Sequence, residues 1–142
     1  MPVIADIAEA VKAGLNAHDF SMEFEAARDY LPVFDLQEMQ TLHVTVVPAG
    51  MTIAKLDRSR TQSDVQVDIG IQKKLSTADN AEIDALMALV EEVVDFLRFR
   101  KLEAFPEALW VSTENNPIFV REHLSEMRQF TSVLSLTYRV AR

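Results

Sequence analysis

The stretch Val65-Gln66-Val67-Asp68-Ile69-Gly70-Ile71 alternates apolar and polar residues almost without interruption, and residues 130–140 repeat the pattern. Successive side chains of a β-strand point to opposite faces, so each stretch is predicted to form a strand with one face on a core and the other on a polar environment. The predicted faces of the first strand are Val65, Val67, Ile69 and Ile71 toward the core, and Gln66, Asp68 and Gln72 away from it.

A long acidic helix is predicted soon after the first of these strands. Ser76 or Thr77 is expected to cap it, and a helix from Asp79 to Arg100 would be about 33 Å long. Its apolar side consists of Ile83, Leu86, Met87, Val90, Val93, Val94 and Leu97, extended by Ala85, Leu89 and Phe96. This side covers about half the circumference, which is more than one sheet requires. We expect the N-terminal helix to pack beside it; the alternative is a neighbouring subunit.

Helical spacing of apolar residues also predicts a first helix, which begins near Pro2 and ends between Asn16 and Asp19. Proline and glycine favour a turn at Pro48-Ala49-Gly50. The other expected elements are strands at 20–30, 42–47, 51–56 and 108–114, a break at Leu31-Pro32, a loop or single turn at 36–40, a turn at 115–117, and a segment without a clear pattern at 118–128.

These elements predict a single α+β domain spanning residues 1–142. The order is helix, strands, helix, strands, which favours a two-layer sandwich with a mostly antiparallel sheet of about five strands and two helices packed on one face. A chain of 142 residues has the usual size of one domain and buries about two-thirds of its unfolded surface. We find no internal repeat or linker.

Composition excludes several classes of protein. A net charge of −8 argues against tight binding of a phosphate backbone, although an acidic surface can let DNA slide past. The chain has no Cys, which excludes a disulfide framework and fits a reducing compartment. Its apolar runs are shorter than the roughly 20 residues that span a bilayer, and its first residues lack the pattern of a signal peptide. We therefore expect no contact with a membrane.

The sequence shows no arrangement of residues typical of a catalytic or metal site. No two of His18, His43 and His123 have the i, i+4 spacing of a helical zinc motif, and Glu122 to Glu126 has no third ligand nearby. Serines lack a nucleophile-elbow context, and 3 glycines leave no loop that could cradle a phosphate. We expect no enzymatic activity, no cofactor and no bound metal.

Several segments together resemble one family. These are Val46 to Gly50, Asp57-Arg58, Asp64 to Lys74, the long acidic helix, and a last strand that opens with Phe130-Thr131-Ser132 and contains Tyr138-Arg139. Over about residues 20–140 the chain resembles the tail terminator, or tail completion, proteins of long-tailed bacteriophages. Head–tail joining ring proteins of the neck resemble it nearly as well, so a head–tail joining role, or that of another minor tail protein, is an alternative.

The resemblance implies a structural protein of the virion, assembled in the host cytoplasm. Its subunits would form a homohexameric ring that caps the tail tube, contacts the tail tube protein and docks to the head connector or neck protein. DNA would pass through the lumen of the ring without specific binding. A small cytoplasmic oligomeric binding protein of another kind remains an alternative, because it could show the same charge and the same apolar surplus.

A long polar connection between two predicted strands is the candidate for contacts between subunits. It runs from Asp57 to Asp64 and carries two closely spaced arginines, whose planar guanidinium groups suit interface carboxylates. An exposed loop with no partner is the alternative. The predicted contact residues, with a ring neighbour or with the tube, are Arg58, Arg60, Gln62, Asp68, Leu89 and Phe96.

Overall fold

A computed structural model of the protein describes residues 2–30, 41–76, 79–115 and 118–141. The elements in these ranges are α1 (Val3–Asn16), β1 (Ala26–Arg28), β2 (His43–Lys55), β3 (Thr61–Lys74), α2 (Asn80–Leu97), β4 (Leu109–Glu114), α3 (Arg121–Met127) and β5 (Gln129–Ala141). The five strands form one sheet in the order β1-β2-β3-β5-β4. Only the β1–β2 pair is parallel. The predicted α+β class and the mostly antiparallel sheet are confirmed.

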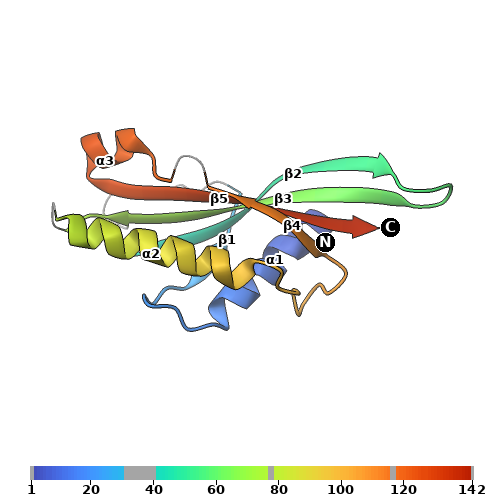
Figure 1. The fold of residues 1–142 in the computed structure, drawn as a ribbon, viewed down its shortest axis with the longest axis horizontal. Helices are drawn as coiled ribbons and strands as arrows, with labels where there is room; N and C mark the ends of the chain where they lie inside the picture. The colour runs from blue at the N-terminus through green and yellow to red at the C-terminus, as the bar shows by residue number, and fades with distance from the viewer. Residues whose placement is uncertain (1, 31–40, 77–78, 116–117, 142) are drawn as a thin grey trace.

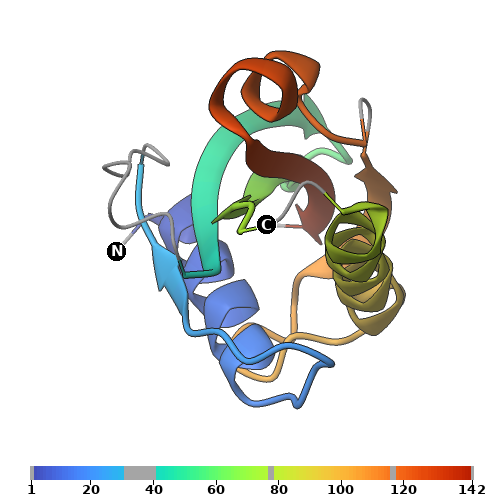
Figure 2. The same cartoon turned by 90° about the vertical axis from the view of Figure 1, so that its left-hand side faces the viewer.

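The sheet curves around the two long helices. Figures 1 and 2 show α1 and α2 on the same face of the sheet, and α3 on the other face at one end. The first helix is confirmed close to its predicted limits, as is the placement of two helices on one face. Residues 118–128 show no clear pattern of apolar and polar residues, and α3 was therefore not predicted.

The alternating strands have the predicted register. Val65, Val67, Ile69 and Ile71 are fully buried. Across the ladder, Val67 pairs with Leu136 and Ile69 with Leu134, and these partners share the core face. On the opposite face Gln66 is exposed and Asp68 is half-buried.

Gln72 lies on the face away from the core, as predicted, but it is buried there rather than open to solvent or a neighbour. Gln72 pairs with Thr131 in the ladder. The ring of His123 lies on α3, and its Nδ1 is 2.9 Å from Thr131 Oγ1. The third helix thus covers the polar face of the sheet at this end.

The predicted turn at residues 48–50 is also wrong, because β2 runs straight through it from His43 to Lys55. The pairing with β3 shifts register between Pro48 and Gly50, so the extra residue forms a bulge. Proline is tolerated at a bulge or at a sheet edge, where its missing N–H breaks no ladder. Both conditions hold here, because β1 pairs only with Val44, Thr45 and Val46.

The hairpin connection is shorter than predicted. Only residues 56–60 lie between β2 and β3, so Gln62 and Asp64 belong to β3 rather than to a loop. One carboxylate oxygen of Asp57 accepts hydrogen bonds from the backbone N–H of Ser59 (2.9 Å) and of Arg60 (2.8 Å). An aspartate that bonds its own backbone in this way forms a compact turn, which allows both strands to continue.

The acidic helix α2 is confirmed, with different ends. Asp79 is its N-cap, and its side chain accepts from the backbone N–H of Ala81. The predicted cap Ser76 instead donates its backbone N–H to Glu82 Oε1 (3.0 Å). The helix ends at Leu97 rather than Arg100. Several predicted features lie outside the described residues: the alternative cap Thr77, the break at 31–32, the loop at 36–40 and the second half of the turn at 115–117.

The predicted strand at residues 20–30 shortens to β1, and the preceding segment is irregular. Phe20 and Phe24 stack at 5.3 Å, and Phe20 also meets Phe96 of α2 edge-on at 5.4 Å. The carboxylate of Glu92 accepts hydrogen bonds from the backbone N–H and the hydroxyl of Ser21. The apolar residues that alternate in residues 20–25 therefore pack against α2, and this segment does not pair with a neighbouring strand in the described ranges.

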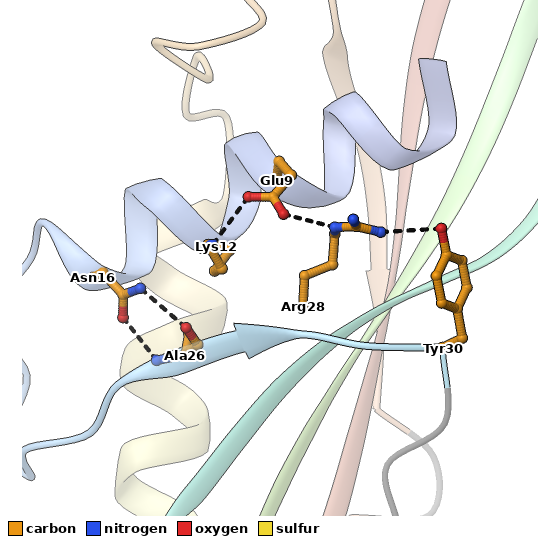
Figure 3. A network of polar contacts seen from close by, with 6 residues as sticks. All are labelled: Glu9, Lys12, Asn16, Ala26, Arg28 and Tyr30. Atoms are coloured by element: carbon orange, nitrogen blue, oxygen red, sulfur yellow. Dashed lines mark hydrogen bonds and ion pairs between the residues drawn. The ribbon is translucent and has the colours of Figure 1, made fainter. Parts of the chain in front are cut away.

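A polar network fixes α1 to β1 (Figure 3). The side-chain amide of Asn16 accepts from the backbone N–H of Ala26 (2.7 Å) and donates to its carbonyl (3.0 Å). Arg28 Nε donates to Glu9 Oε1 (2.7 Å), and Lys12 pairs with the other oxygen of that carboxylate (3.0 Å). These two cations hold the pKa of Glu9 below its usual value, with Arg28 as the larger cause.

Candidate assembly surfaces

The hairpin of β2 and β3 projects beyond the helices (Figure 1), and every residue from 51 to 61 is exposed. Met51 pairs with the buried Val65, and Ile53 pairs with the buried Ser63. Cross-strand partners share a face, so these two apolar side chains continue the core face of the sheet past the helices that cover it. With Leu56 in the turn they form an exposed apolar patch, the hairpin surface; the exposed fractions are 44%, 60% and 44%.

The two predicted arginines lie at the end of this hairpin, but in different situations. Arg60 is held within the turn, where its Nη2 is 2.8 Å from Asp57 Oδ2. The backbone N–H of Ser59 and the Arg60 guanidinium keep the pKa of Asp57 below its usual value. Arg58 is exposed, and no hydrogen bond or ion pair joins it to any residue in the described ranges. Arg58 is therefore the arginine with a free guanidinium.

A second apolar patch lies at the opposite edge of the sheet. Phe99 follows α2 with a φ of 59° and is 82% exposed. Its ring meets Trp110 of β4 edge-on at 4.8 Å. Leu109 (63% exposed) and Val111 (37%) are exposed on β4 at the same edge. Trp110 pairs with the buried Tyr138 and lies on the core face, whereas Leu109 pairs with Arg139 and points to the polar face. Phe99, Leu109 and Val111 are called the edge surface below.

The backbone of Phe99 is strained. A left-handed conformation costs a residue with a Cβ about 1–2 kcal/mol. Strain of this kind collects at functional positions, and exposed apolar clusters mark surfaces that bind a partner. Phe99 combines both properties, so the edge surface is a stronger candidate for a contact than its size alone would indicate.

The other predicted contact residues are divided by burial. Leu89 is fully buried in the core, so its place among the contact residues is wrong. It falls on the sheet-facing side of α2, which only the packed fold reveals. Phe96 is half-buried, with the ring of His18 at 4.3 Å and the Arg100 guanidinium carbon 3.9 Å from its centroid. These neighbours leave Phe96 little free surface.

Gln62 and Asp68 remain partly accessible on β3. Asp68 lies on the polar face of the sheet and accepts a hydrogen bond from Gln66 Nε2 (3.2 Å). The same face carries an ion pair in which Arg139 Nε and Nη2 donate to the two oxygens of Asp64 (2.9 and 3.1 Å). This face therefore has hydrogen-bonding groups and charges of both signs along β3 and β5.

The chemistry of a catalytic or metal site was tested in the same ranges. The described residues contain no group of three or more His, Cys, Asp or Glu side chains placed to hold a metal ion. His18 stacks on aromatic rings, and His123 contacts Thr131. None of the helices in the described ranges combines the length and apolar character needed to cross a membrane.

Sequence reasoning found the hairpin but missed both apolar patches. Residues 51–56 were predicted as a strand, without any assignment of Met51 and Ile53 to a face. Nothing local shows that the covering helices stop short of these residues. Phe99 was predicted to lie inside the long helix up to Arg100, whereas it follows the end of α2 in a left-handed conformation and is largely exposed.

Comparisons with known proteins give a structural match only. No protein-family model matches the chain, and no curated protein does. A chain in the virion of a native gene transfer agent (GTA) particle is similar over 100% of both chains, with a TM-score of 0.65 and 14% sequence identity. The sheath/tube terminator of an extracellular contractile injection system, in its extended state, gives a TM-score of 0.48 at 20% identity, and this chain spans 57% of its length. At 14% identity the first similarity shows a shared fold, and the second is too low for that conclusion.

Proposed function

We propose that this protein is a structural component of a phage-like tail, and specifically a tail terminator. Its subunits form a closed ring that caps the tail tube and joins it to the head connector. The observation that carries the proposal is the full-length fold similarity to a chain of a gene transfer agent virion. The resemblance of about residues 20–140 to tail terminators, carried by the segments named above and the long acidic helix, gives further support.

The shape of the subunit suits assembly into a ring. A ring subunit must offer two different surfaces, one to each neighbour. The projecting hairpin and the β4 edge lie at opposite edges of one sheet and each carries an exposed apolar patch. Single exposed apolar side chains are ordinary on a monomer, but clustered ones indicate contacts.

The charge of the chain also suits a channel for DNA. A net charge of −8 and an exposed acidic side of α2, with Asp84, Glu91 and Asp95, disfavour binding to a phosphate backbone. A ring through which a genome passes needs a lumen that does not retain it. We assign no residue to the lumen.

Deletion of the gene from the genome that encodes the particles tests this function. We expect tails of irregular length without attached heads in electron micrographs, and recovery of normal particles when the wild-type gene is supplied in trans. Tails of normal length that lack heads would instead indicate a head–tail joining protein. Normal particles without the gene would overturn the tail assignment altogether and favour an unrelated binding protein.

Purified protein gives a second readout. Light scattering is expected to report a mass about six times that of the 16.0 kDa chain, alone or in the presence of tail tubes. Electron micrographs of this species would show a ring. A particle of two subunits that does not change when tubes are added would contradict the ring.

A further inference from the structure

The edge of β4 lies at the same level along the strands as the part of β2 where the projecting hairpin begins. Following the ladder from β4 across the sheet, Leu109 pairs with Arg139, Arg139 with Asp64, and Asp64 with Thr52 of β2. At the other end of β4, Glu114 leads by the same route to Val47. The edge of β4 is therefore level with residues 47–52 of β2.

Among the described residues, the outer edge of β2 is also unpaired in this region. β1 pairs with residues 44–46 alone, so no strand in the described ranges covers the edge of β2 from Val47 to Lys55. The free edge of β4 thus lies across the sheet from the free edge of the hairpin. Two copies placed side by side can bring these edges together without a shift along the strands.

Strand direction favours the same arrangement. Because β2, β3, β5 and β4 are antiparallel in succession, β4 runs opposite to β2 within one subunit. In a ring whose axis follows the strands, every copy keeps the same orientation. The β4 strand of one copy would then lie antiparallel to the β2 strand of the next, as neighbouring strands do within the subunit.

The charges of the two surfaces are complementary on the β4 side alone. Residues 102–114 carry Glu103, Glu107 and Glu114 and no Lys or Arg, whereas residues 49–62 carry Lys55, Arg58 and Arg60 against a single Asp57. Phe99 is instead flanked by the cations Arg98, Arg100 and Lys101. The hairpin cations would therefore lie against the glutamates of residues 102–114, at the rim of the apolar contact. Pro48 and the bulge beside it interrupt backbone pairing, so the side chains beyond them carry the contact.

We propose that the hairpin surface of one subunit (Met51, Ile53, Leu56) binds the edge surface of a second copy of this chain (Phe99, Leu109, Val111). The contact is head-to-tail, with Arg58 near the glutamates of the neighbour. Because each copy has one surface of each kind, the contact can be repeated from copy to copy, and it closes into a ring when the rotation between neighbouring copies divides a full turn. This inference rests on the proposed function, since it describes how that ring is built.

Cysteine cross-linking tests the contact directly, because the natural chain contains no Cys. Separately purified Ile53→Cys and Leu109→Cys proteins are mixed and treated with a short bis-maleimide. We expect a covalent dimer in the mixture that exceeds either protein alone by about tenfold. Ser125→Cys on α3, exposed at the opposite end of the molecule (Figure 1), replaces Leu109→Cys as the matched control and should give only background.

A second variant removes the contact without weakening the fold. Phe99→Gly relieves a left-handed backbone and deletes the most exposed aromatic ring. We expect an unchanged or higher melting temperature together with self-association about tenfold weaker.

Three results would overturn the interface. These are rings that form without the 53–109 cross-link, Ile53→Cys protein that links only to itself, or protein that gives no cross-link even at high concentration. None of them decides the function, because the deletion experiment on particles reports on that separately. Normal self-association of Phe99→Gly would likewise remove Phe99 from the contact.

Discussion

Asp64 and Arg139 face each other across β3 and β5, and the Arg139 guanidinium donates two hydrogen bonds, 2.9 and 3.1 Å long, to the Asp64 carboxylate. The pair lies on the polar face of the sheet, on the same ladder row as Leu109 and Thr52. The Arg139 guanidinium holds the pKa of Asp64 below its usual value. It therefore links the two strands that lie between the proposed contact edges.

This pair makes stability depend on pH. Because the folded-state pKa of Asp64 is lowered, the stabilisation is present above the unfolded value of about 3.8 and is lost as the pH falls through the folded pKa. Both side chains are partly exposed, so we expect the pair to contribute less than about 1 kcal/mol to the free energy of unfolding. Urea unfolding of wild type, Asp64→Asn and Arg139→Gln at several pH values measures this contribution. Both variants should lose less stability on acidification than wild type; equal slopes would contradict the prediction.

The register of β3 predicts the effect of a buried charge. Val67 is fully buried opposite Leu136, so Val67→Asp should cost several kcal/mol because it buries a carboxylate without a partner. Asp68→Asn, the adjacent residue on the polar face, should leave the fold intact. Circular dichroism during thermal unfolding separates the two. Similar melting temperatures for both variants would mean that the core face has been assigned to the wrong residues.

The side chain of Asn16 acts as a neighbouring strand for β1, since it satisfies both backbone groups of Ala26. Asn16→Ala removes both hydrogen bonds and should destabilise the protein by about 1–2 kcal/mol. The amide of Ala26 should also exchange faster with solvent, which hydrogen exchange detects. Asn80→Ala, at the exposed start of α2, is the control and should stay within about 0.5 kcal/mol of wild type.

We expect the protein to bind no structural zinc, because its three histidines are not grouped into a metal site. His18 and His123 are engaged in ring and hydrogen-bond contacts in separate parts of the molecule. Metal analysis of protein purified without a histidine tag should find zinc well below one atom per chain. Stoichiometric zinc whose loss follows substitution of His18, His43 or His123 would show that a site had been missed.

The elements that the sequence predicted well are those whose pattern is decided by local burial. The period-two alternation around Val67 and the helical periodicity around Val90 each reflect contact with a single core. The turn predicted at Pro48 failed because a proline breaks a strand only where its N–H would have a partner. Whether it has one depends on which strand lies beside it, and that is a property of the whole sheet.

The assembly surfaces were only partly predictable for a related reason. Charge and exposure at Arg58 follow from a polar stretch of sequence, and this prediction of exposure is confirmed. Leu89 and Ile53 are both apolar residues in amphipathic segments, yet one is fully buried and the other is 60% exposed. The difference arises because α1 and α2 end before the hairpin does, and no local pattern contains that information.

Arg58 provides the last test, because its guanidinium is free whereas that of Arg60 is held by Asp57. Reversal at Arg60 would place a second carboxylate beside Asp57 and disturb the turn, so the single variant Arg58→Glu is the cleaner probe. We expect it to keep the wild-type melting temperature and to weaken ring formation measured by light scattering, more strongly at low salt. Arg121→Glu, exposed on α3 at the other end of the molecule, should change neither. Normal assembly of Arg58→Glu would leave Arg58 as a solvated residue outside the contact.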